Sequence, residues 1–196
     1  MLDIKPFISA VAIILTFLGY IPYIKDTLKG KTTPHAYTWL IFGLVTAFVF
    51  GLQVTAGAGI GALITLAISI TTFFIFALSL FKGEKQITLS DTIFFILALI
   101  ALALWLFAHQ PILSVVLLSI INIFAFVPTV RKSWNKPFSE TVSTYVMNAT
   151  RHGISLLALE HYNIITYLFP LSATVVTFLF VFILIIRRGN IKTQAL

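Results

Sequence analysis

The chain has 196 residues, of which 59% are apolar and 10% are charged, and its mean hydropathy is +1.05. This composition excludes an ordinary soluble globular domain and predicts an integral membrane protein. Seven spans of roughly 20 residues each would occupy most of the chain, so no separate soluble domain is expected. The absence of cysteine excludes disulfides, thiol catalysis and cysteine metal sites.

Apolar runs between polar breaks predict an all-α protein with seven membrane-spanning helices. The break between the second and third runs is the least marked, because Gln53 and Gly57 are its main interruptions. The first run lacks a preceding positive segment and a convincing cleavage site, so we expect a retained span and not a signal peptide. In chain order the predicted spans are residues 6–24, 36–54, 60–81, 92–108, 112–130, 141–159 and 164–186.

The formal net charge of +7 is explained by membrane topology without a nucleic-acid partner. An odd number of spans places the two termini on opposite sides of the membrane. One side then receives eleven of the thirteen Lys and Arg residues, the other side receives Lys5, and Arg151 falls inside the sixth span. Because cytoplasmic loops retain Lys and Arg, we expect a multi-pass protein of the cell membrane with its N-terminus outside and its C-terminus in the cytoplasm.

A shift of 106 positions superposes the first three predicted spans on the last three. Pro22 then meets Pro128, and Trp39 meets Tyr145. Three spans are an odd number of crossings, so a single span between the two units gives both the same orientation. We therefore expect two parallel three-helix bundles, at residues 1–83 and 111–189. A linker with the fourth helix, at residues 84–110, joins them, and a cytoplasmic tail follows at residues 190–196.

This plan of three, one and three spans, with a proline near the cytoplasmic end of the first and fifth, resembles the SWEET and PQ-loop (MtN3-like) superfamily of membrane transporters. The resemblance covers essentially the whole chain, although Tyr23 and Thr129 replace the glutamine that follows proline in the PQ pair. It implies a facilitative uniporter that moves a sugar between the two bundles by alternating access, with Pro22 and Pro128 as hinges. From the residues alone, each proline could equally end its span near the basic interface.

The sixth predicted span carries a polar stripe through the centre of the membrane. Arg151 lies about midway along it and cannot lose its proton, and the chain has no acidic residue at comparable depth. It therefore requires an anion or many acceptors: either a substrate carboxylate, phosphate or ring of hydroxyls, or helix carbonyls, Asn122 and water. The stripe occupies a sector of about 120° on a helix and consists of Thr141, Thr144, Tyr145, Asn148, Arg151, His152 and Ser155.

The second span, which the repeat aligns with this stripe, supplies an aromatic wall of Trp39 and Phe42. Aromatic rings stack on the apolar faces of sugars or planar ligands, while polar groups fix orientation. Trp39 and Tyr145 resemble the paired aromatic residues of SWEET binding sites, and packing without a ligand is the alternative for these rings. His152 could couple transport to protons or act as a neutral hydrogen-bonding group. The predicted substrate site consists of Trp39, Phe42, Asn122, Tyr145, Asn148, Arg151 and His152.

These features predict a carrier and not an enzyme, because no nucleophile with a base and no carboxylate pair is expected at membrane depth. The scattered histidines predict no metal site, and no cofactor is expected. The expected partners are membrane lipid and a small-molecule substrate, either a sugar or a hydroxylated or carboxylate-bearing metabolite, and a homo-oligomer is left open. Two alternatives remain: a receptor similar to the KDEL receptor that binds a peptide carboxylate, and a vitamin carrier similar to the PnuC family that stacks nucleoside-like ligands on Trp39.

Overall fold

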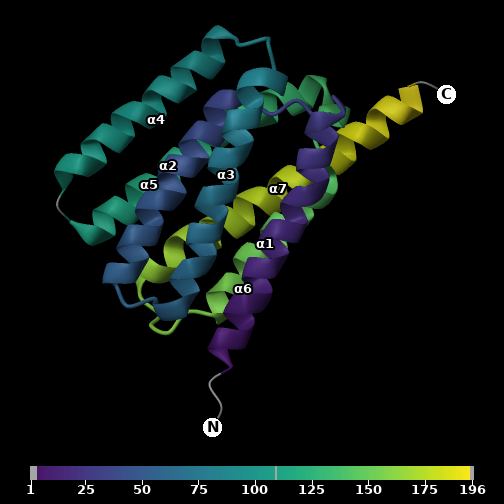
Figure 1. Cartoon of the computed structure of the whole chain (residues 1–196). Coiled ribbons are helices and arrows are strands. Elements are labelled where there is room, and N and C mark those ends of the chain that lie inside the picture. The colour runs from purple at the N-terminus through teal and green to yellow at the C-terminus, as the bar shows by residue number, and fades with distance from the viewer. Residues whose placement is uncertain (1–3, 109, 195–196) are drawn as a thin grey trace.

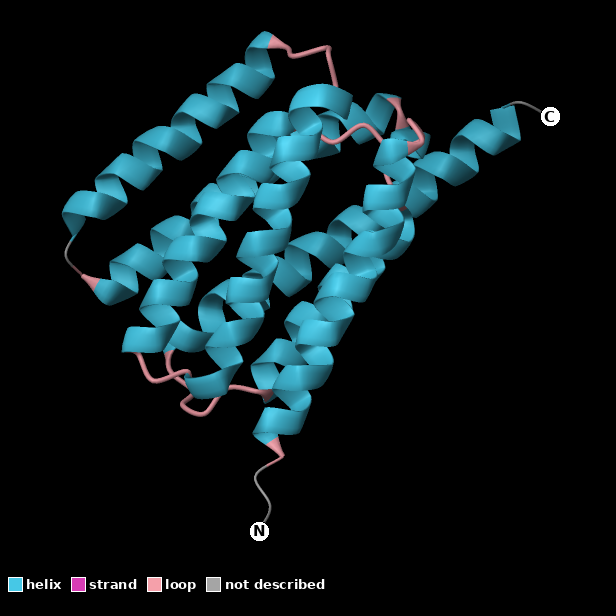
Figure 2. Cartoon of the chain, viewed as in Figure 1, coloured by secondary structure: helices cyan, strands magenta, loops and turns pink. Residues whose placement is uncertain are grey.

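The computed structural model of the chain describes residues 4–108 and 110–194, and these residues form helices and short connections without a strand (Figure 2). The predicted all-helical class is confirmed. Short 3-10 turns, η1 (Gly59–Gly61) and η2 (Pro137–Ser139), precede the third and sixth α-helices. The α-helices are α1 (Lys5–Leu28), α2 (Ala36–Thr55), α3 (Ala62–Lys82), α4 (Leu89–Ala108), α5 (Pro111–Asn135), α6 (Val142–Leu157) and α7 (Ile164–Gln194).

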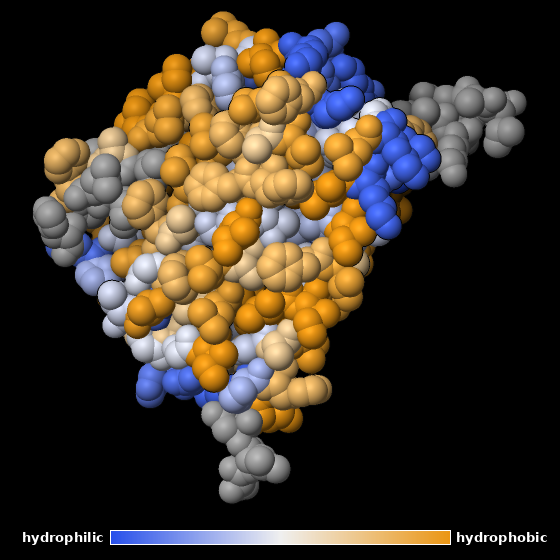
Figure 3. Space-filling model, in the orientation of Figure 1, coloured by the Kyte–Doolittle hydropathy of each residue, from blue (hydrophilic) through white to orange (hydrophobic). Residues whose placement is uncertain are grey.

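Five helical segments of the described chain are long and apolar enough to cross a membrane, namely α1, α2, η1 with α3, α5 and α7. Large apolar side chains such as Phe7, Phe81 and Leu89 are exposed. Figure 3 shows apolar residues over most of the visible face, with hydrophilic residues gathered towards its two ends. These features are compatible with a membrane protein. That all seven helices cross the membrane stays a prediction.

The helices pack in the same order in the two halves of the chain. In the first half α3 packs against α1 and α2, and in the second half α7 packs against α5 and α6. Two further pairs join the halves, because α1 packs against α6 and α2 packs against α5. Helix α4 stands at one edge of the bundle, where it packs mainly against α5 (Figure 1). The space enclosed by these pairs is where residues from both halves meet.

Basic residues collect at one end of this bundle. The α1–α2, α3–α4 and α5–α6 connections and the C-terminus lie at that end, whereas the N-terminus lies at the other (Figure 1). At the N-terminal end the Nζ of Lys5 donates to the carbonyl of Glu160 at 3.2 Å. We call the end that carries the Lys- and Arg-rich connections the basic end.

The helix limits differ from the predicted spans at two informative places. Pro22 and Pro128 lie inside α1 and α5, so both helices continue past the proline and neither proline ends its helix. That a membrane span ends near each proline stays a prediction. Helix α7 continues to Gln194, so residues 190–194 of the predicted tail extend the helix, and residues 195–196 lie outside the described residues.

Asp91 in the first turn of α4 ties that helix to α5 at the basic end. Arg131 donates two hydrogen bonds to the Asp91 carboxylate, at 2.7 and 2.6 Å, and the backbone N–H of Thr88 donates a third at 2.9 Å. Burial alone would raise the pKa of Asp91, but these hydrogen bonds lower it below its ordinary value. The carboxylate therefore stays charged at neutral pH and keeps the start of α4 in place.

A close approach of α2 and α3 at Gly43 gives a direct test of the packing. A Cβ at Gly43 would lie 2.8 Å from the ring of Phe73, whereas a Cβ at Gly51 of the same helix would meet no atom within 4 Å. We expect Gly43→Ala to destabilise the protein by about 1–3 kcal/mol through overpacking. The measurement is thermal unfolding of the purified protein in detergent. Gly51→Ala is the matched control, and equal unfolding midpoints for the two variants would contradict this packing.

Candidate functional site

The polar stripe of α6 points into the protein. The helix has 16 residues, which corresponds to about 24 Å and is shorter than a typical bilayer core of about 30 Å. Helices α1 and α7 pack against it. The interior therefore shields the stripe from lipid, and the buried side chains are those of Thr144, Tyr145, Asn148, Arg151, His152 and Ser155.

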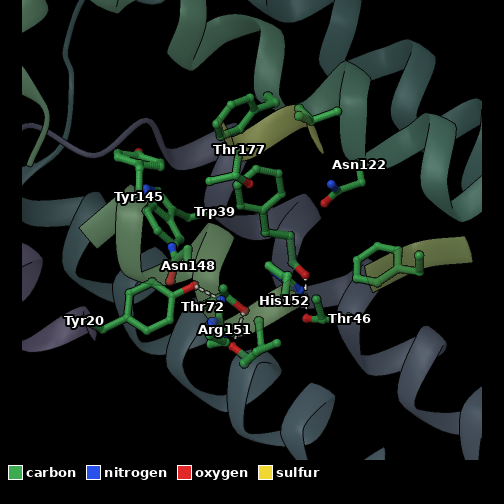
Figure 4. A pocket seen from close by; sticks show the side chains of 15 residues that line it. Tyr20, Trp39, Thr46, Thr72, Asn122, Tyr145, Asn148, Arg151, His152 and Thr177 are labelled. Atoms are coloured by element: carbon green, nitrogen blue, oxygen red, sulfur yellow. Dashed lines mark hydrogen bonds between the residues drawn. The ribbon is translucent and has the colours of Figure 1, made fainter. Parts of the chain in front are cut away.

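A small cavity of about 40 Å³ lies beside this stripe. Its walls come from α1, α2, α3, α5, α6 and α7, and Thr46, Thr72 and Asn122 line it near the midpoints of α2, α3 and α5 (Figure 4). Space for one water requires roughly 10–15 Å³ on this scale, so the cavity holds only a few waters. The lining residues are Tyr20, Trp39, Phe42, Thr46, Ile68, Thr72, Asn122, Phe126, Tyr145, Asn148, Arg151, His152, Phe169, Val176 and Thr177.

Corresponding positions of the two halves face this cavity together. Four pairs of lining residues are separated by 106 positions, the shift that superposes the first and last three spans. The paired residues are chemically different, because the first half contributes mainly aromatic rings and the second half contributes most of the hydrogen-bonding groups. The pairs are Tyr20 with Phe126, Trp39 with Tyr145, Phe42 with Asn148, and Thr46 with His152.

Arg151 is buried at the cavity wall, with 1% of its surface exposed. Its guanidinium donates to the hydroxyls of Thr16 at 3.3 Å and Tyr20 at 3.2 Å. The guanidinium carbon also lies 5.2 Å from the centre of the Tyr20 ring, which is a cation–π contact. Both partners are neutral, so they solvate the guanidinium but leave its charge uncompensated. The Nε of Arg151 has no hydrogen-bond partner among the described residues.

Further polar residues of the cavity lie on α6, the helix of Arg151, and on α5. The side-chain oxygen of Asn148, one turn before Arg151, has no hydrogen-bond partner within the described part of the chain. The ring of His152 meets the edge of Phe169, with the ring centres 6.4 Å apart. Asn122 lines the cavity from α5. In the described structure Thr16 and Tyr20 bind the guanidinium. The alternative in which helix carbonyls, Asn122 and water hold Arg151 named a different side chain.

A layer of aromatic rings separates the cavity from the basic end. The indole N–H of Trp39 donates to the hydroxyl of Tyr23 at 3.2 Å, and these two rings lie 5.0 Å apart. On the other side of the layer, the ring of Phe180 packs 4.7 Å from that of Tyr145 and 4.8 Å from that of Phe126. All five side chains are buried. These rings therefore pack together on the side of the cavity that faces the basic end.

Behind the aromatic layer lies a buried ion pair between Lys132 and Glu140. The Nζ of Lys132 also donates to the carbonyl of Thr33, in the α1–α2 connection, and the hydroxyl of Tyr145 donates to the Glu140 carboxylate at 2.9 Å. The hydroxyl of Thr129 donates to that of Thr38 at 3.0 Å and joins α5 to α2. Tyr145 therefore links the cavity wall to an ion pair that is bonded to both halves.

Polar contacts join the helices at the opposite end. The hydroxyl of Thr65 donates to the side-chain oxygen of Gln53 at 2.6 Å, and the side-chain nitrogen of Gln53 donates to the carbonyl of Thr166 at 3.2 Å. The backbone N–H of Ile60 donates to the Glu160 carboxylate at 3.3 Å. These bonds join α2 and α3 to the α6–α7 connection and α7. The cavity thus has interhelical contacts on both sides.

All seven residues predicted to bind substrate lie in the lining of this cavity. The sequence reasoning missed Tyr20, which contacts Arg151, and Phe126, which lies opposite it in the repeat. One signal could have found Tyr20. The repeat aligns Thr16 with Asn122, a predicted site residue, and Tyr20 follows Thr16 by four positions, so the two share a face of α1. Among the described residues, no group of three or more His, Cys, Asp or Glu side chains could hold a metal ion.

Comparisons with known proteins give no independent assignment. No protein-family model, no curated protein and no solved structure matches the chain. The resemblance to the SWEET and PQ-loop superfamily therefore rests on the span plan and the proline positions of the sequence.

Proposed function

We propose that the protein is a multi-pass membrane carrier that moves a small polar solute by alternating access, similar to a SWEET facilitative transporter. The observation that carries this proposal is the cavity that corresponding residues of the two halves line together, near the middle of the helices. A site between two like units can open to either side when the units rock against each other. The solute class follows from the polar groups of Asn148, Arg151 and His152.

The small volume of the cavity supports a mechanism with a conformational change. Pockets for drug-sized ligands measure roughly 300–1,000 Å³, whereas this cavity measures about 40 Å³. A sugar-sized solute therefore requires the helices to separate around it. We propose that the polar and aromatic contacts at both ends of the cavity belong to a closed conformation, which opens when a solute enters.

Pro22 and Pro128 are the proposed hinges of this change. A proline inside a helix removes one backbone hydrogen bond and disturbs the preceding turn. Both prolines lie between the cavity-lining part of their helix and the basic end. Bending at these positions would move the basic ends of α1 and α5 and leave the lining residues in place. The proposed orientation puts the basic end and the C-terminus in the cytoplasm, because it carries most of the Lys and Arg residues.

Flux across proteoliposomes tests this proposal. Purified protein is reconstituted, and uptake of labelled sugars, hydroxy acids, amino acids and nucleosides is measured against empty liposomes. The carrier predicts saturable uptake of at least one of these classes. Uptake should stop when the concentrations inside and outside the liposomes are equal, as expected for a uniporter. Tight binding of a peptide carboxylate without flux would support the receptor alternative and contradict the carrier.

A further inference from the structure

We infer that the solute is a small organic acid with a single negative charge, whose carboxylate binds Arg151 in the cavity. This inference rests on the proposed carrier function and names its substrate class. It depends on three features of the cavity: an uncompensated positive charge, unpartnered polar atoms beside it, and apolar walls around the remaining space.

The first feature is the charge. Asp26, Glu84, Asp91, Glu140 and Glu160 all lie near the ends of the helices or in connections, and no described acidic residue lines the cavity. Glu140, behind the aromatic layer, is already paired with Lys132. The cavity therefore carries the fixed charge of Arg151 without a protein anion to balance it. A buried charge without a counterion is strongly unfavourable, and a bound anion removes most of that cost.

The second feature is the set of free hydrogen-bonding positions. A guanidinium has five N–H donors, and Arg151 donates hydrogen bonds to the hydroxyls of Thr16 and Tyr20. Its Nε and the side-chain oxygen of Asn148 are both buried and without a partner in the described structure. Figure 4 shows Tyr20, Asn148 and Arg151 on the same side of the cavity. A carboxylate would accept from the free guanidinium donors, and a hydroxyl on the solute would donate to Asn148.

The third feature is the apolar wall. The rings of Trp39, Phe42, Phe126 and Phe169 also line the cavity. These rings favour an apolar or planar body beside the carboxylate. A cationic solute would be repelled by Arg151, and a neutral sugar would leave its charge uncompensated. A small hydroxy acid, oxo acid or aromatic acid matches all three features.

Matched pairs of compounds that differ in charge test this inference. The probes are lactate with lactamide, and benzoate with benzamide, together with glucose and sodium chloride. Binding is measured as quenching of Trp39 fluorescence in a Trp105→Phe/Trp134→Phe background, which leaves Trp39 as the only tryptophan, and as a shift in the unfolding midpoint. We expect at least one acid to bind and its amide to bind about 100-fold more weakly, since the amide leaves the cation without its partner.

Three variants locate the binding. Arg151→Gln removes the cation, and Asn148→Asp places a carboxylate one turn away, where it can pair with Arg151 and keep the fold intact. Both should abolish binding of the acid. Thr150→Val, between them in sequence but exposed on the surface of α6, should leave it unchanged.

Several results would overturn the inference. These are equal binding of acid and amide, binding of glucose in preference to the acids, no response to any acid, persistence of acid binding in Asn148→Asp, or an equal Arg151-dependent response to chloride alone. The uptake assay separates this failure from that of the carrier. Acid binding without uptake would keep the carboxylate site and contradict transport, whereas uptake of glucose without acid binding would keep transport and contradict the acid.

Discussion

Replacement of Lys132 by Met is expected to lower the free energy of unfolding by about 3–5 kcal/mol, because it leaves a buried carboxylate without its cation. The side chains of Lys132 and Glu140 are 2% and 0% exposed, so water cannot replace the lost partner. The change also removes the hydrogen bond to the carbonyl of Thr33 that joins the two halves at the basic end. The measurement is the unfolding midpoint in detergent at neutral pH.

Lys136, the residue that follows the last residue of α5, provides the matched control for this prediction. It forms an ion pair with Glu84 at 3.3 Å, but 47% of its side chain is exposed. An exposed pair contributes about 0–1 kcal/mol, so Lys136→Met should have little effect. The double variant Lys132→Met/Glu140→Gln should recover much of the lost stability, because both charges are gone. Equal effects of the two single lysine variants, or no recovery in the double variant, would contradict a buried ion pair.

Replacement of Arg151 by Met is expected to abolish ligand binding and to reduce uptake by at least about 100-fold, while the protein stays folded. The physical reason is that Thr16 and Tyr20 only solvate the guanidinium in the described structure and do not neutralise it. A buried, unneutralised charge lowers the stability of the protein, whereas an apolar side chain of similar length in the same place does not. We therefore expect an unfolding midpoint equal to or above that of the unmodified protein, together with the loss of function. Arg151→Lys should retain part of the binding, because it keeps the charge but loses the planar fork.

The structural interpretation of Arg151 predicts the opposite pattern. If the residue only holds α6 against α1, Arg151→Met should lower folding yield and midpoint, and ligand binding of the folded fraction should be unchanged. Thr16→Val tests the same contact from the other side. It removes one acceptor, so we expect a small loss of stability and retained uptake.

The polar face of α6 could be predicted from the sequence because helical periodicity alone determines which side chains share a face. Arg151, Asn148 and Tyr145 follow this periodicity, and the repeat then placed Trp39 opposite them. The partners of Arg151 were harder to predict. Tyr20 lies on an apolar helix where an aromatic ring is equally suited to lipid, so its role appears only when α1 packs against α6.

The buried ion pair at the basic end could not be predicted from the sequence either. In the sequence, Lys132 and Glu140 fall between the fifth and sixth predicted spans, in a connection where both side chains would be expected to contact water. The structure buries both side chains, and η2, which follows α5 directly in the chain, packs against α5. Periodicity identifies the face of a helix, but it does not specify which loop covers its end.

The most direct test of the central claim is whether one position of the cavity wall reacts from both sides of the membrane. The chain has no cysteine, so a single Thr177→Cys variant presents one thiol at the cavity wall. Val175→Cys, on the same helix at a position that is 51% exposed on the bundle surface, is the lipid-facing control. Each variant is treated with a membrane-impermeant thiol reagent in right-side-out and in inside-out vesicles. The carrier predicts that the thiol of the Thr177→Cys variant reacts in both preparations, while that of the Val175→Cys variant stays inert in both. Reaction of the Thr177→Cys variant from one side only, or from neither, would contradict alternating access.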